Sequence, residues 1–134
     1  MRLVVDSNII FSALINPGGK TAEVIFLKDI ELFSVRTLEK EIFEYKKEIL
    51  EKSRLSEVGF ELFYEVLLSK IIFIETAEIS EFSSAAKEVC PDSDDVSFFA
   101  LCLAKNLPLW SNDKELNKQN VIQIIRTEEL VKMV

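Results

Sequence analysis

The fold of this chain is decided by residues 95–113, which read DVSFFALCLAKNLPLWSND. The part from 96 to 104 is apolar almost all round, which is typical of a helix buried between two layers. A short strand is expected to follow at 108–111. Asp95 stands where the helix begins, and Asp113 comes shortly after the strand. The segment therefore predicts a buried helix and a strand that are flanked by two carboxylates.

Short apolar runs alternate with helical patterns along the rest of the chain. Five runs are predicted to be strands: 3–5, 33–35, 71–74, 108–111 and 121–125. Between them lie predicted helical segments at 9–15, 21–29, 57–68, 83–89, 113–118 and 127–133, besides the buried helix and one that starts at Thr37. Strands that alternate with helices favour a parallel sheet with right-handed crossovers. We expect a three-layer α/β fold with a central, mostly parallel five-stranded sheet flanked by helices.

The helix that starts at Thr37 has the clearest amphipathic pattern. Its apolar residues recur at spacings of four, three and four, which places them on one face. They are Leu38, Ile42, Tyr45 and Ile49. The Thr37 hydroxyl is expected to cap the helix, and Glu41 flanks the apolar stripe.

Length and composition indicate an ordinary globular protein. The 134 residues are best interpreted as one domain over 1–134, and 49% of them are hydrophobic, which excludes a disordered chain. No apolar run is long enough to span a bilayer, and nothing suggests export. The two cysteines, Cys90 and Cys102, lack metal-ligand spacing and fit free thiols in a reducing cytoplasm.

Charge and the absence of histidine restrict the possible chemistry. The net charge of −7 argues against a domain that binds nucleic acid through excess positive charge alone. Two interpretations remain: either the partner is basic, or divalent cations neutralise part of the negative charge. The chain has no histidine, so a histidine general base and a Ser/His/Asp triad are both excluded.

Four carboxylates stand where strands end or helices begin: Asp6, Glu41, Asp95 and Asp113. In open α/β sheets the binding crevice lies beyond the carboxyl ends of the strands, so these side chains are expected at one edge if the first and fourth strands are neighbours. Ordinary roles compete with this hypothesis. Asp94 or Asp95 could simply cap a helix, and Glu41 could be a solvated helix residue. Asp6 is harder to explain in this way, because a carboxylate directly after a buried strand is costly unless it is paired or bound to metal.

Carboxylates this close would repel one another and raise each other's pKa. A hard divalent cation relieves that repulsion, and Mg²⁺ or Mn²⁺ takes oxygen ligands. Two such ions can support an in-line attack of water on phosphorus.

Three stretches, in this order, resemble the PIN domain family: Val5-Asp6-Ser7-Asn8-Ile9, the helix start Thr37–Ile42, and Asp95 with its apolar helix leading to Leu109–Asp113. The resemblance covers essentially the whole chain. Its strongest element is the spacing of 18 between Asp95 and Asp113, with Ser111 at the family's Ser/Thr position. That family includes the ribonuclease toxins of VapC-type toxin and antitoxin pairs.

The resemblance implies roles for named residues. Asp6, Glu41 and Asp95 would be catalytic metal ligands, and Asp113 a fourth acid that holds a second metal or its water. Ser7, Asn8 and Ser111 would support these ligands from positions outside the metal's own contacts. The expected cofactor is Mg²⁺ or Mn²⁺.

The function implied is that of a metal-dependent endoribonuclease which hydrolyses RNA, as the toxin of a pair with an antitoxin protein. The alternative is a non-catalytic module of the same fold that serves RNA processing or binds protein. We also expect a homodimer, because apolar residues such as Phe43, Leu50 and Phe63 exceed what one buried face per helix requires.

Overall fold

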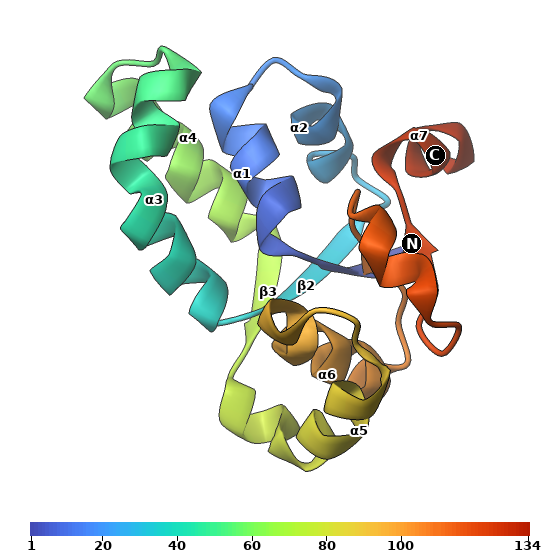
Figure 1. The fold of residues 1–134 in the computed structure, drawn as a ribbon. Coiled ribbons are helices and arrows are strands. Elements are labelled where there is room, and N and C mark those ends of the chain that lie inside the picture. Colours follow the sequence, from blue (N-terminus) through green and yellow to red (C-terminus); the bar gives the residue numbers. More distant parts are fainter.

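The computed structural model describes all residues from Met1 to Val134. The strands are β1 (Arg2–Val5), β2 (Glu31–Val35), β3 (Ile71–Ile74), β4 (Leu109–Trp110) and β5 (Ile124–Ile125). The helices are α1 (Ser7–Ile15), α2 (Lys20–Ile25), α3 (Thr37–Ser53), α4 (Glu57–Ser69), α5 (Ser83–Val89), α6 (Val96–Lys105) and α7 (Thr127–Met133), as Figure 1 shows. Three short 3-10 segments cover Thr76–Phe82, Ser93–Asp95 and Lys114–Lys118.

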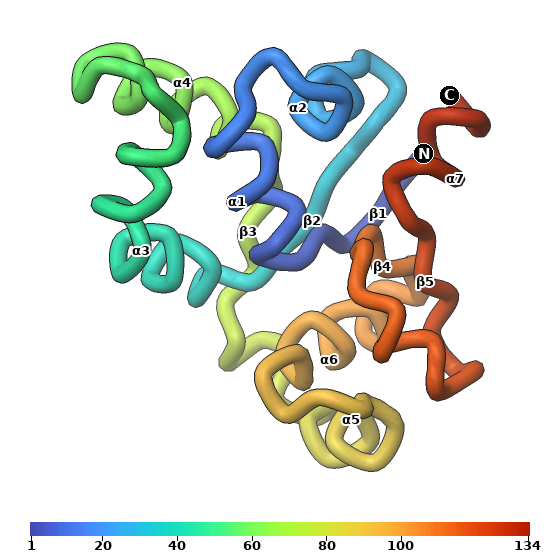
Figure 2. The backbone as a smooth tube through the Cα atoms, turned by 45° about the horizontal axis from the view of Figure 1, so that its top comes forward, coloured from blue at the N-terminus to red at the C-terminus, as the bar shows by residue number.

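All five strands pair in parallel, in the order β3-β2-β1-β4-β5. Figure 2 shows this order across the sheet, with β2 and β3 on one side of β1 and β4 and β5 on the other. The predicted five-stranded α/β fold is therefore confirmed. The strand order runs from β1 outwards to β3 on one side and then continues from β4 to β5 on the other. The neighbours β1 and β4 therefore form the topological switch point, and the expected binding crevice lies at their carboxyl ends.

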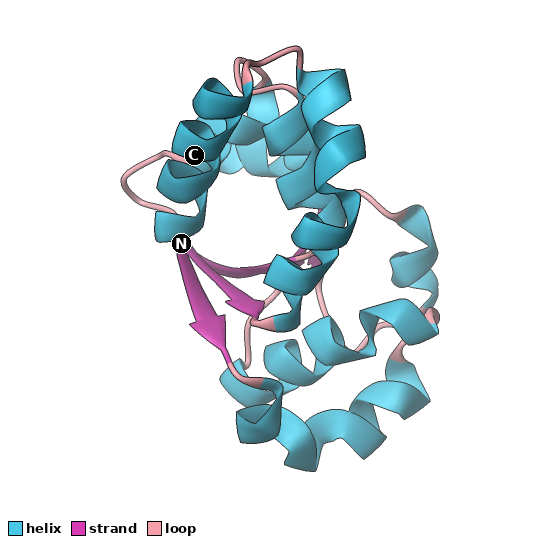
Figure 3. Ribbon diagram, turned by 90° about the vertical axis from the view of Figure 1, so that its left-hand side faces the viewer, coloured by secondary structure: helices cyan, strands magenta, loops and turns pink.

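Successive strand residues point to opposite faces of the sheet and build two cores. Leu3, Val5 and Trp110 belong to the core beneath α1 to α4 and α7. Val4 and Leu109 belong to the second core, beneath α5 and α6. Figure 3 shows the strands between these two helical layers. This period of two explains the apolar runs, because strands covered on both faces have no polar side.

Helix α6 is buried as its sequence predicts. Five consecutive residues, Phe98 to Cys102, are at most 1% exposed. The helix ends at Lys105 and is capped by Asn106, which adopts a left-handed conformation with φ of 55°. No helix of the structure combines the length and the apolar character needed to cross a membrane.

The helix at Thr37 differs from its prediction in two respects. Thr37 is already inside α3, and the residue at the cap position, Arg36, makes no side-chain cap bond, so the predicted threonine cap is wrong. The Arg36 amide instead donates to Ile74 of the neighbouring strand. Tyr45 is 49% exposed rather than buried, and its ring packs edge-on against Phe11 with centroids 5.8 Å apart.

Several predicted segments are too long, among them the strand expected at 108–111, which contains only Leu109 and Trp110. The last strand was expected at 121–125 but contains only Ile124 and Ile125, because the side-chain oxygen of Gln119 accepts the Val121 and Ile122 amides at 2.9 and 2.8 Å. The second helix was expected at 21–29 but ends at Ile25, after which the chain makes short turns into β2.

Candidate metal centre

Asp6 and Ser111 follow neighbouring strands at the carboxyl edge of the sheet. The Asp6 side chain is buried, and its Oδ1 accepts the Ile9 amide at 3.0 Å, which caps α1. The Ser111 hydroxyl, which is also buried, accepts the Asp113 amide at 3.2 Å. These bonds fix the loops after β1 and β4, so the carboxylates they carry are held in place.

A cavity of about 370 Å³ opens at this edge; Ser7 lines it, whereas the neighbouring Asp6 does not. Six carboxylates line it: Glu41, Glu44, Asp92, Asp94, Asp95 and Asp113. The charges of Asp113 and Glu41 also act on Asp6. The structure thus brings Asp6, Glu41, Asp95 and Asp113 together, although they come from four separate parts of the chain.

The closest group within the cavity is Asp92, Asp95 and Asp113. One carboxylate oxygen of each lies within 4.8 Å of the others. Asp6 and Glu41 lie outside this group of three. Three oxygens at that separation can converge on one small cation, which makes this triad the most compact set of possible ligands.

Asp92 is the member that the sequence did not single out. Its carboxylate accepts the Asp94 amide at 3.0 Å, and its carbonyl oxygen accepts the Cys90 thiol at 3.0 Å. Asp92 stands three residues before Asp95 in an acidic loop, and that charge density was the available signal. An acid in a loop has no periodicity that would show which way it faces, so Asp92 could not be separated from Asp94.

The capping explanation does not account for Asp95. Asp95 occupies the cap position of α6, yet its side chain accepts no cap bond. Asp113 does cap the following 3-10 segment by accepting the Glu115 amide at 3.0 Å. The Asp95 carboxylate is therefore free for another partner.

Burial and mutual repulsion raise the pKa of two of these carboxyls. Burial raises the pKa of Asp6 to about 6, against hydrogen bonds from Ser111 and Ile9 that lower it, and the charges of Asp113 and Glu41 raise it further. Burial also raises the pKa of Asp95 to about 7, helped by the nearby charges of Asp6, Asp92, Asp113 and Asp94. Burial and the neighbouring charges therefore disfavour the ionised form of both carboxyls.

The donor set of this cavity fits a hard divalent cation. No lysine or arginine lines the cavity, so no side chain there neutralises the acids. Carboxylate oxygens are the ligands that Mg²⁺ and Mn²⁺ prefer, and a cation among them would remove the repulsion that raises the pKa of Asp95.

The three predicted supporting residues lie at the same place. Ser7 and Asn8 line the cavity from the first turn of α1. Ser111 joins Asp6 to the loop that carries Asp113 through its hydroxyl.

The sequence profile of a known family, described as the PIN domain, matches residues 4–132. No curated protein matches the chain in sequence. Among solved structures, the chain is similar to one in the crystal structure of VapBC2 from Rickettsia felis bound to a DNA fragment from their promoter. The TM-score is 0.69 at 14% identity, and the match covers 94% of this chain and 98% of the other.

Proposed function

Because this chain belongs to the PIN domain family, we propose that it is a metal-dependent endoribonuclease that hydrolyses phosphodiester bonds of RNA. The observation that carries this proposal is the set of acids around one cavity with no cation to neutralise them. A domain that only binds a partner has no need to hold repelling carboxylates together. Metal-assisted hydrolysis does need them.

The chain's own residues have the following roles in this proposal. Asp92, Asp95 and Asp113 supply carboxylate oxygens to Mg²⁺ or Mn²⁺, and Asp6 and Glu41 complete the negative site around them. Ser111 holds the Asp113 loop, while Ser7 and Asn8 shape the wall beside α1. A bound divalent cation supplies a Lewis acid that polarises the phosphate and acidifies a water molecule. The chain has no histidine, so a carboxylate of the cavity or the solvent would take the proton of the attacking water in this proposal.

We further propose that the chain acts as the toxin of a toxin and antitoxin pair in the cytoplasm. The support is its family and its similarity to a chain of VapBC2. The two free thiols, Cys90 and Cys102, fit a reducing compartment. Expression should arrest growth, and co-expression of the neighbouring gene product should relieve the arrest. Growth that continues at full rate during expression would contradict the toxin role.

The experiment that tests the nuclease proposal uses the purified chain, free of any partner, with a panel of single-stranded and structured RNAs. We expect cleavage in Mn²⁺ or Mg²⁺ and none after addition of a chelator. Asp95→Asn should abolish cleavage, whereas Lys70→Gln, directly before β3 at the opposite edge of the sheet, should not. Metal binding without cleavage of any RNA would favour the non-catalytic module instead.

A further inference from the structure

Positive charge gathers beside the acidic cavity, in a hollow next to α7. This hollow measures about 540 Å³ and is larger than the acidic cavity. Three cations line it, Lys20, Arg126 and Lys132, against one carboxylate, Glu128. The whole chain has 16 basic and 23 acidic residues, so this local excess of positive charge runs against the overall balance.

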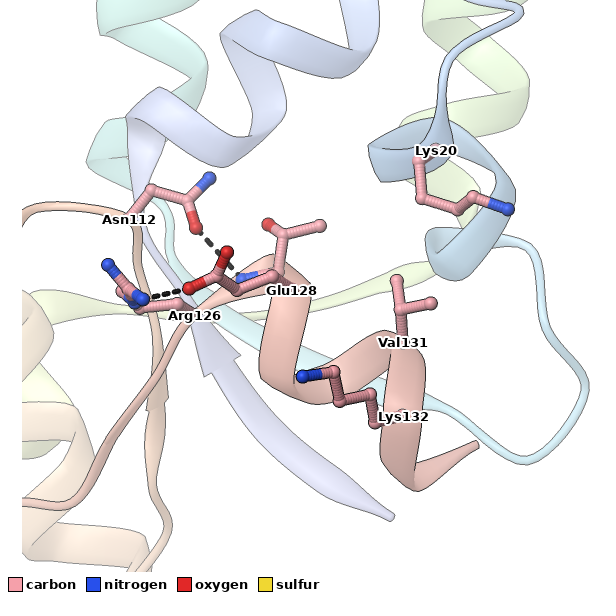
Figure 4. Close-up of a pocket in the computed structure, with 7 residues that line it drawn as sticks. Lys20, Asn112, Arg126, Glu128, Val131 and Lys132 are labelled. Atoms are coloured by element: carbon pink, nitrogen blue, oxygen red, sulfur yellow. Dashed lines mark hydrogen bonds and ion pairs between the residues drawn. The ribbon is translucent and has the colours of Figure 1, made fainter.

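The hollow and the acidic cavity lie on two sides of one loop. Asn112 lines the hollow, and its neighbour Asp113 lines the cavity. The Asn112 side-chain oxygen accepts the Thr127 amide at 2.9 Å, and the Thr127 hydroxyl accepts the Trp110 indole N–H at 2.9 Å. Figure 4 shows Asn112, Arg126 and Glu128 together at the start of α7, with Lys20 across the hollow on α2. Helix α7 is therefore tied directly to the loop that carries an acid of the candidate centre.

The sheet register places Arg126 close to the acids. Ile125 pairs with Trp110, so the next residues, Arg126 and Ser111, leave adjacent strands side by side. The Ser111 amide donates to Ile125 at 3.1 Å. Adjacent strands are about 4.8 Å apart, so Arg126 follows a strand end two strands, or about 10 Å, from the one that carries Asp6.

Of the three cations that line this hollow, only Lys132 has no carboxylate partner, because Lys20 pairs with Glu23 at 3.2 Å and Arg126 is also paired. Lys132 is exposed and takes part in none of the chain's ion pairs. Arg126, at the cap position of α7 with its side chain 31% exposed, pairs with Glu128 and Glu129, and a phosphate that binds it would replace these carboxylates.

We propose that Arg126 and Lys132, with Asn112 between them and the acids, bind phosphate groups of the RNA strand that flank the scissile bond. This inference rests on the proposed nuclease function and names the part of the molecule that holds its substrate. Contacts to phosphate position a strand without reading its sequence. They would also offset the repulsion between an RNA strand and a protein of net charge −7.

The test measures binding of a short fluorescein-labelled single-stranded RNA by anisotropy, over a series of salt concentrations. Asp95→Asn is the background, so that no cleavage occurs. Lys132→Gln and the double variant Arg126→Gln/Lys132→Gln are compared with Lys70→Gln. Lys70 is the matched control, because it is also outside every ion pair but precedes β3 at the opposite edge of the sheet. Thermal melting confirms that each variant is folded. If the double variant is not folded, the single variant Lys132→Gln still provides the test.

We expect Lys132→Gln to weaken RNA binding several-fold and to reduce the slope of log K against log salt by about 0.7, the value for one phosphate contact on a single strand. The double variant should reduce it by about 1.4. In the active background, Lys132→Gln should raise KM more than it lowers kcat. Lys70→Gln should change neither the affinity nor the slope.

Other results overturn the inference. If the parent cleaves RNA in Mn²⁺ but Lys132→Gln and the double variant bind with unchanged affinity and slope, the subsite is wrong and the nuclease function stands. If the parent neither binds nor cleaves RNA, both proposals fall. Saturable binding of inorganic phosphate that is lost in the variants while RNA binding is kept would indicate a site for a free phosphate. An acidic peptide can be titrated in the same way. If the variants lose affinity for this peptide but keep their affinity for RNA, the hollow would be a contact site for another protein.

Discussion

The most informative residue is Asp95, whose half-buried carboxylate is surrounded by like charges. Its pKa of about 7 means that burial and the neighbouring acids oppose its ionised form. An aspartate held in this way destabilises the fold at neutral pH unless a cation joins it. The sign of its contribution to stability therefore depends on metal.

We predict that Asp95→Asn stabilises the metal-free protein at about pH 8 by roughly 1–2 kcal/mol, allowing for partial solvent screening. The melting temperature should rise by a few degrees. Mn²⁺ should raise the melting temperature of the parent but not that of the variant. Calorimetric melts with chelator and with Mn²⁺ measure both effects. Equal responses of parent and variant to Mn²⁺ would rule out a metal site at Asp95.

The stability of the metal-free protein should depend on pH, because the pKa of Asp95 and that of Asp6 are raised in the folded state. Between about pH 4 and pH 7 the folded protein holds protons on Asp95 and Asp6 that the unfolded chain, with a pKa of 3.8, has lost. The free energy of unfolding contributed by these groups therefore falls as pH rises through this window. Urea titrations with chelator should show the advantage of Asp95→Asn over the parent growing from about pH 4 to pH 7 and levelling off above that. An advantage that is independent of pH would contradict the assigned cause.

Asp92 and Asp94 provide a matched pair. Both lie in the acidic loop and line the cavity, but only Asp92 belongs to the triad within 4.8 Å. We expect Asp92→Asn to weaken Mn²⁺ binding at least tenfold and Asp94→Asn to weaken it much less, as measured by isothermal titration calorimetry. Similar losses in the two variants would mean that overall charge, rather than the triad, determines affinity.

The position of an acidic side chain in the fold could be inferred from the sequence where the acid follows a strand. The places of Asp6 and Asp113 at one edge of the sheet could be inferred because parallel strands align their carboxyl ends. Membership of Asp92 in the closest group could not be inferred, because the direction of a loop side chain depends on hydrogen bonds such as that from the Asp94 amide.

At the scale of elements, the sequence is most informative where burial alone decides structure. Helix α6 could be predicted from its continuous apolar run, whereas the ends of α2 and β5 could not. The limits of β5 are set by the Gln119 side chain, which takes the amides of two residues that would otherwise extend the strand. Such side-chain bonds compete locally with secondary structure and have no pattern in the sequence.

The buried position of α6 leads to a prediction for stability. Leu101 is fully buried in the second core, between the sheet and α5. Leu101→Ala should lower the free energy of unfolding by about 2–5 kcal/mol, because it removes apolar contacts and leaves a cavity. Exposed Leu62→Ala on α4 is the control and should cost far less. Equal losses, measured by urea denaturation, would show that α6 is not the central buried helix.

At the scale of the whole molecule, the five-stranded parallel sheet could be predicted from the alternation of strands and helices, because crossover connections favour a parallel order. Which apolar side chains are exposed could not be predicted from the sequence. Leu50 and Phe63, expected to be exposed, pack against the first core, and Phe63 lies against Phe26. Phe43 remains 78% exposed, and α4 exposes Val58, Leu62 and Val66.

We propose that this exposed surface of α3 and α4 joins two copies in a homodimer, since a monomer rarely leaves so many apolar side chains in water. Replacing Phe43 and Leu62 together by serine should shift the protein to a monomer in multi-angle light scattering and lower its melting temperature, because the partner copy stabilises only the folded state. A parent protein that is already monomeric at high micromolar concentration would contradict this prediction.

We propose that the carboxylates at this edge form a divalent-metal site that cuts RNA. The most direct measurement is single-turnover cleavage of a labelled RNA as Mn²⁺ is titrated, beside calorimetric titration of Mn²⁺ into the same protein. We predict that cleavage and metal binding reach half-saturation at the same Mn²⁺ concentration, and that Asp95→Asn loses both. Cleavage that persists in chelator, or that is unchanged in Asp95→Asn, would contradict the claim.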